Sequence, residues 1–120
     1  KKPAIILDVA HNADGITQIN TQLELMTFRH LHIVTGMVKD KEVDKVLHLL
    51  PKYADYYFTK AQIPRALPEQ ELAEKAAAIG LNGKTFPAVN MAIKDALTHA
   101  HEDDLILVCG SVFLVGEVSL

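Results

Sequence analysis

Residues 89–111, VNMAIKDALTHAHEDDLILVCGS, hold the two patterns that decide the fold of this 120-residue chain. In the first half, apolar residues recur with the 3.6-residue period of an amphipathic α-helix. They are Val89, Ala92, Ile93, Ala96, Leu97 and Ala100. In the second half, Asp104–Cys109 contains the apolar run Leu105–Val108 and is typical of a strand buried within a sheet, and Gly110–Ser111 begins another helical segment. A helix that leads into a buried strand is the repeating unit of parallel α/β sheets.

The same alternation continues outward to the start of the chain. We expect further strands at Ala4–Leu7, Leu31–Thr35, Ala54–Thr59 and, on a weaker pattern, Gly83–Phe86. We expect further helices at 16–26, Glu42–Leu50 and 68–80. The first strand has no polar residue, which predicts a strand buried on both faces. The order predicts an α/β domain with a mostly parallel open sheet and helices on both faces, a Rossmann-like arrangement of three layers.

Composition limits the classes of function. A chain of 120 residues fits one domain, and 49% hydrophobic residues suffice for one core. The formal net charge of −3 argues against a nucleic-acid or anionic membrane partner, because both need clustered Lys and Arg. The lone cysteine, Cys109, lies in an apolar run, so we expect a buried thiol and a cytoplasmic, reducing location. No signal peptide precedes the first strand, and both ends are abrupt, so we expect a piece of a longer protein.

Candidate binding residues follow the first and last predicted strands. Ligands of open parallel sheets bind beyond the carboxyl ends of the strands, where the sequence places Asp8, His11, Asn12 and Ser111. Asp8 could accept hydrogen bonds from a ribose, or only tie down the following loop. His11 could hold a carboxylate or phosphate, or be a hydrogen-bonded turn residue. Ser111 could help a helix N-terminus to hold a carboxylate, or act as an N-cap only, which is the role we expect for Asn12.

Several common sites are absent from the sequence pattern. The chain has no phosphate loop, no dinucleotide fingerprint, no nucleophile elbow, and no clustered His or Cys for a metal ion. We expect Lys39, Asp40 and Lys41 to form a solvated loop, the alternative being that Lys39 or Lys41 faces an anion. The histidines in strands and helices, and the charges of 102–104, are expected to be solvated or locally satisfied. The sequence thus predicts an incomplete site, with no catalytic residue and no metal ligand of its own.

Three segments carry a resemblance to a known family. Residues 6–15, ILDVAHNADG, resemble the D-x-A-H-N-P motif of folylpolyglutamate synthases and dihydrofolate synthases. Residues 110–118, GSVFLVGEV, are similar to the G-S-L-Y-L-V-G-E-V ending of that family, and residues 36–41, GMVKDK, to its glycine-then-D-K-D loop. The three motifs stand in the family's order and span nearly the whole chain. The family belongs with the Mur ligases, which join an amine to a carboxylate through an ATP-derived acyl phosphate.

The resemblance implies that residues 1–120 are the C-terminal domain of such a ligase. An N-terminal domain of the same parent chain would then carry the phosphate loop, the Mg²⁺ ligands and most of the folate site. By motif, Asp8 would contact the nucleotide of ATP, and His11 and Ser111 would help to place the incoming glutamate. Two positions depart from the pattern: Ala13 replaces a proline, and Phe113 replaces a common tyrosine. The isolated chain is expected to be inactive.

Two other functions remain open at this point. One is a non-catalytic α/β module that binds a ligand or a protein. The other is the C-terminal domain of a different Mur-type ligase, which would consume a different amino acid. Neither the motifs nor their departures indicate whether a parent folate ligase acts on dihydropteroate, on folates that already carry glutamate, or on both.

Overall fold

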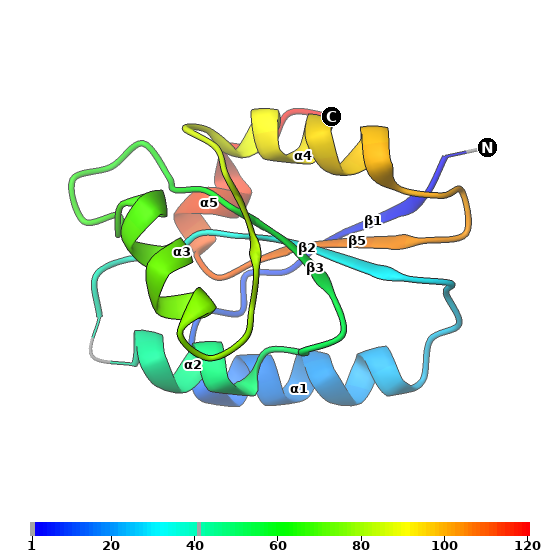
Figure 1. The fold of residues 1–120 in the computed structure, drawn as a ribbon, viewed down its shortest axis with the longest axis horizontal. Coiled ribbons are helices and arrows are strands. Elements are labelled where there is room, and N and C mark those ends of the chain that lie inside the picture. The colour runs from blue at the N-terminus through cyan, green and yellow to red at the C-terminus, as the bar shows by residue number, and fades with distance from the viewer. Residues whose placement is uncertain (1, 41) are drawn as a thin grey trace.

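A computed structural model describes residues 2–40 and 42–120, and its centre is a five-stranded sheet (Figure 1). The strands are β1 (Ala4–Leu7), β2 (Leu31–Thr35), β3 (Asp55–Phe58), β4 (Gly83–Thr85) and β5 (Leu105–Cys109). The helices are α1 (Ala13–Glu24), α2 (Val43–Leu49), α3 (Glu69–Ala77), α4 (Val89–His99) and α5 (Val112–Gly116). The alternation predicted from the sequence is confirmed, including the weakly signalled fourth strand.

The strands lie in the order β1-β5-β2-β3-β4, and every pair is parallel. The last strand in the sequence is therefore inserted between the first and the second. Leu105 is paired with Ala4 on one side and with Leu31 on the other. This insertion brings the loops that follow β1, β5 and β2 to neighbouring positions at the carboxyl edge of the sheet.

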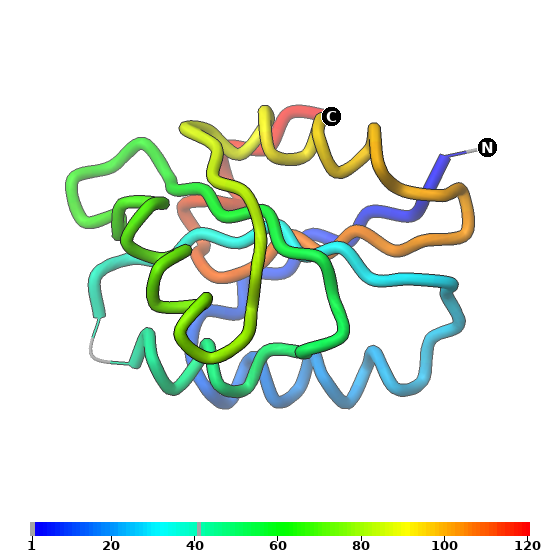
Figure 2. The backbone as a smooth tube through the Cα atoms, in the orientation of Figure 1, coloured from blue at the N-terminus to red at the C-terminus, as the bar shows by residue number. Residues whose placement is uncertain are grey.

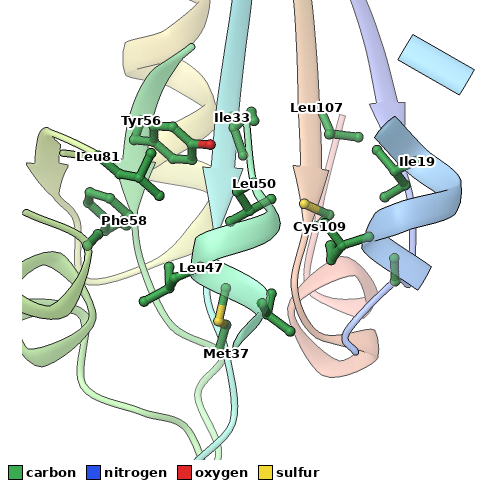
Figure 3. Close-up of a cluster of buried hydrophobic side chains, with 14 of the residues drawn as sticks. Ile19, Ile33, Met37, Leu47, Leu50, Tyr56, Phe58, Leu81, Leu107 and Cys109 are labelled. Carbon is green, nitrogen blue, oxygen red and sulfur yellow. The ribbon is translucent and has the colours of Figure 1, made fainter. Parts of the chain in front are cut away.

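Helices cover both faces of the sheet, which confirms the predicted three layers. Alternate residues of the strands point to opposite faces, so Ile33 joins one core cluster and Val34 the other. Buried side chains of α1, α2 and α3 fill the first cluster, and those of α4 and α5 fill the second. Figure 1 shows α1 and α2 below the sheet and α4 and α5 above it, and Figure 3 shows Leu50, at the end of α2, next to Ile33.

β1 corrects one expectation. The sequence predicts a strand buried on both faces, but Ala4 and Leu7 are exposed and the two residues between them are half-buried. The reason is the position of β1 at the edge of the sheet, where β5 is its single neighbour. A continuous apolar run does not distinguish a central strand from an apolar edge strand.

A buried polar network at the amino edge of the sheet corrects a second expectation. Asp104, predicted to be solvated or locally satisfied, has a fully buried side chain whose oxygens accept from Arg29 (2.8 and 3.1 Å) and from His32 Nε2 (2.8 Å). Burial alone would raise the pKa of this carboxyl, but the hydrogen bonds from His32, Arg29 and the His101 amide (2.9 Å) hold it well below its usual range. The partners His32 and Arg29 lie in another part of the sequence, so spacing along the chain does not reveal them.

No described helix has the length and apolar character needed to cross a membrane. The helices are short, and α1, with 12 residues, is well below the roughly 20 residues that a span requires.

We predict that Gly110→Ala destabilises the chain. Gly110 has a φ of +114°, and a Cβ atom there would lie 2.5 Å from Thr35 Oγ1 and 2.6 Å from the Gly36 carbonyl oxygen. Strain and overpacking together should lower the free energy of unfolding by at least about 2 kcal/mol in a urea titration. Gly116→Ala is the matched control, because nothing lies within 4 Å of a Cβ there, and its effect should stay within about 1 kcal/mol. Equal effects of the two substitutions would contradict this account.

Candidate functional site

The loop after β1 is held in shape by the side chain of Asp8. Its Oδ1 accepts a hydrogen bond from the Ala10 amide at 2.9 Å, and the Asp8 amide itself donates to the Val108 carbonyl of β5 at 2.9 Å. Asp8 therefore does tie down the loop, as one of its two sequence interpretations states. Among the described residues, no group bonds its second carboxylate oxygen.

His11 forms the turn that the alternative interpretation describes. Its Nδ1 lies 3.1 Å from the Val9 carbonyl oxygen, which can only accept, so Nδ1 carries the proton. Nε2 is thereby fixed as the acceptor of the neutral ring and becomes a second donor when the ring is protonated. His11 is exposed. Asn12 caps α1 as expected, because its Oδ1 accepts from the Gly15 amide at 2.9 Å.

Ser111 is the N-cap of α5. Its Oγ accepts from the amides of Phe113 (3.1 Å) and Leu114 (3.4 Å), so the amides of the second and third residues of the helix are already satisfied by this side chain. The hydroxyl proton is not used in those bonds and can still be donated. The backbone just before Ser111 is held against the loop after β1, because the Gly110 amide donates to the Ala10 carbonyl at 2.9 Å.

The structure brings His11 and Ser111 together and places Asp8 next to them. His11 and Ser111 line one cleft of about 200 Å³. Asp8 and His11 line a second cleft of about 250 Å³, which runs along α1. His11 thus stands between the two clefts, and Ser111 and Asp8 lie on opposite sides of it.

Arg65 is a candidate that sequence patterns miss. It lines the 200 Å³ cleft together with Asp40, and it comes from the irregular segment after β3. A bridge between Val38 and Ala66, with a hydrogen bond from the Lys39 amide to the Arg65 carbonyl (2.8 Å), holds this segment against the loop after β2. The only sequence signal is a lone arginine in a loop, and the bridge that brings it to the cleft has no pattern.

For the loop after β2, the sequence offers two interpretations: a solvated loop, or a loop in which Lys39 or Lys41 faces an anion. Lys39 is exposed and does not line the cleft that contains Asp40 and Arg65. Lys41 lies outside the described residues.

Cys109 lies beneath the carboxyl edge and is fully buried, as predicted. Burial raises the pKa of its thiol to about 12, and the negative charge of Asp8 adds to the rise. The group is therefore a neutral packing residue at physiological pH, and Figure 3 shows it among apolar side chains that face α1 and α2. The site contains no thiolate nucleophile at this position.

Comparison with known proteins gives a family match over most of the chain. Residues 1–112 match the family described as Mur ligase, glutamate ligase domain. The chain is 30% identical over 120 residues to the dihydrofolate synthase/folylpolyglutamate synthase of Escherichia coli K12, covering 98% of this chain and 28% of that protein. It spans less than a third of the length of the curated relatives it matches.

Two solved structures share the fold. E. coli FolC in complex with ADP superposes with a TM-score of 0.85 at 30% identity, over 96% of this chain and 28% of that one. A bifunctional folylpolyglutamate synthase/dihydrofolate synthase with Mn, AMPPNP and L-glutamate bound gives a TM-score of 0.84 at 29% identity, over 94% of this chain and 27% of that one.

We predict that Cys109 does not react with a thiol reagent in the folded chain. Because its pKa is raised to about 12 and the side chain is buried, the nucleophilic thiolate is scarce and inaccessible at pH 8. Reaction with Ellman's reagent should be at least about 100-fold faster in denaturing urea than in buffer. The chain has one cysteine, so one thiol per chain is the expected end point in urea. Similar rates in buffer and in urea would contradict the burial.

Proposed function

This chain belongs to the Mur ligase family as a glutamate ligase domain, and on that premise we propose that it serves an ATP-dependent ligase that adds glutamate to folates or to dihydropteroate. The chain would be the C-terminal domain, working with an N-terminal domain of the same parent chain in the cytoplasm. The observation that carries the proposal is that His11 and Ser111, from loops at opposite ends of the sequence, line one cleft.

The cleft suits an amino acid with two carboxylates. Arg65 supplies a permanent cation, and the Ser111 hydroxyl and a protonated His11 supply further donors, all of which favour a carboxylate. Asp40 lies in the same cleft. Its carboxylate would hold the ammonium group of the amino acid until that group loses a proton and becomes the attacking amine. Support for glutamate also comes from the similar bifunctional synthase that was solved with L-glutamate bound.

We assign the nucleotide to the second cleft, which Asp8 and His11 line. Asp8 has one carboxylate oxygen in use by the loop and one left to accept from a ribose hydroxyl of ATP. The similar structures contain ADP or AMPPNP, and one also contains Mn. Asp8 and Asp40 line different clefts, so they do not form a joint site for a divalent ion, and we assign Mg²⁺ to ligands of the N-terminal domain.

The role of this domain is to position reactants. In the proposed reaction, the amine of glutamate attacks the carbonyl carbon of a folyl phosphate, the amide bond forms and inorganic phosphate leaves. None of the described residues at the cleft needs to form a covalent bond. Holding two reactants in alignment can lower a barrier by about 7–11 kcal/mol, which is the contribution that Asp8, His11 and Ser111 would share.

We predict that the isolated 120-residue chain has no ligase activity, because it holds no phosphate loop. Purified chain with ATP, Mg²⁺, a reduced folate and glutamate should release ADP at the rate of a protein-free blank. Glutamate-dependent ADP release that follows the chain through purification would contradict the proposed division of labour.

In the full-length parent enzyme, we predict that single substitutions in the two clefts change the KM values of different substrates. Asp8→Ala should raise the KM for ATP, because an acceptor for the ribose is lost. His11→Ala and Ser111→Ala should raise the KM for glutamate, each by roughly 10-fold, the loss expected for one hydrogen bond of about 1.4 kcal/mol. Steady-state kinetics with each substrate varied in turn measure both effects.

His48→Ala is the control for His11→Ala, because His48 is exposed on α2 and lies 2.7 Å from the Asp44 carbonyl of its own helix. Its kinetics should match those of the parent. Loss of a cap alone would lower the stability of Ser111→Ala by about 0.5–2 kcal/mol and leave the KM for glutamate unchanged. If all three variants lose stability but keep both KM values, the assignment of the clefts is wrong.

A further inference from the structure

We propose that His30, His32 and Asp55 bind a zinc ion at the amino edge of the sheet, opposite the ligase clefts. His30 directly precedes β2, His32 is its second residue, and Asp55 is the first residue of the neighbouring β3. One ligand atom from each lies within 4.8 Å of the other two. Two imidazoles and one carboxylate are a donor set that zinc takes in proteins, leaving a fourth position for water.

The distances within this cluster suit a tetrahedral ion. His30 Nε2 lies 3.1 Å from Asp55 Oδ2, and His32 Nδ1 lies 4.0 Å from the same oxygen. Ligands about 2.0–2.1 Å from a tetrahedral zinc ion are separated from one another by roughly 3.4 Å. The observed distances lie on either side of that value, so small side-chain rotations suffice to close the site.

The buried carboxylate of Asp104 prepares His32 for this role. His32 Nε2 lies 2.8 Å from Asp104 Oδ2, and a carboxylate only accepts, so Nε2 carries the proton and Nδ1 presents its lone pair. A histidine that binds zinc through one nitrogen while the other donates to a carboxylate is the usual arrangement at such sites. The Tyr57 hydroxyl, 3.0 Å from Nδ1, donates to it, and it must release that bond when zinc binds.

Charge and access also favour a cation. Asp55 and Asp104 bring two carboxylates to His32, and the charge of Asp104 is shared with Arg29 on its far side. The side chains of Asp55 and His30 are 63% and 34% exposed, whereas that of His32 is 3% exposed. An ion can therefore enter from solvent and reach the buried nitrogen last.

The site is far from the proposed ligase clefts. In Figure 2 the connections that lead into β2 and β5 lie at the right-hand end of the molecule, and α5, which follows β5, lies toward the left. Zinc would link β2 to β3 directly and to β5 through Asp104, and so would stabilise the amino edge of the sheet. This inference does not depend on the proposed ligase function.

The test is a zinc titration of the purified chain, first stripped with EDTA and dialysed. Calorimetry is expected to give one zinc per chain, and zinc is expected to raise the melting temperature, because an ion that binds only the folded state stabilises it. Mg²⁺ at the same concentration is expected to do neither, because it prefers six oxygen ligands. Absence of zinc binding, or equal binding of Mg²⁺, would overturn the proposal.

Substitutions of the proposed ligands test where the zinc ion binds. His30→Gln and Asp55→Asn each change a partly exposed side chain, and each is expected to weaken zinc binding by at least about 10-fold while melting close to the parent chain without metal. Tyr57→Phe removes the hydroxyl that competes for Nδ1 and is expected to bind zinc at least as tightly as the parent. His48→Gln, on α2, is expected to bind as the parent does. Zinc binding that survives both His30→Gln and Asp55→Asn would place the ion elsewhere and overturn the proposal.

Discussion

The insertion of β5 between β1 and β2 is the constraint on which the rest of the structure depends. All five residues of β5 are buried, and each lies in the sheet between two parallel neighbours or at the end of that pairing. Its odd and even residues enter opposite cores, so Leu107 packs toward α1 and α2 and Ile106 toward α4. A strand of this kind must be apolar throughout, which explains the uninterrupted run from Leu105 to Cys109.

The position of β5 in the sheet also determines where the polar residues at its two ends lie. At its amino end, Asp104 enters the sheet beside His32, and the cost of burying its charge is offset by three donors. At its carboxyl end, a Cβ atom on Gly110 would overlap with Thr35 and Gly36, so a side chain does not fit. The tight turn then presents Ser111 beside the loop after β1. One buried strand thus connects the amino-edge network to the carboxyl-edge clefts.

The fold was largely predictable from the sequence because it depends on local periodicity. Strand runs and helix periods gave the element order and the three layers, and motif order indicated the family. The parts that were missed depend on pairing across the sheet. Asp104 and His32 look like ordinary charged or polar residues until β5 and β2 are side by side, and Arg65 reaches the cleft only through the bridge between Val38 and Ala66. The edge position of β1 is likewise set by strand order, which its composition does not encode.

The structural and functional interpretations of Asp8, His11 and Ser111 are compatible, although the sequence presents them as alternatives. Each side chain uses one part of its hydrogen-bonding capacity to shape its own loop: a carboxylate oxygen of Asp8, Nδ1 of His11, and the acceptor lone pairs of Ser111. Within residues 2–40 and 42–120, each keeps another part unbonded, namely the second oxygen, Nε2 and the hydroxyl proton. The internal bonds orient the free atoms, because a side chain held at one atom loses less entropy when a ligand binds the other. A loop-forming residue is therefore well suited to position a substrate, and its loss should affect stability and binding together.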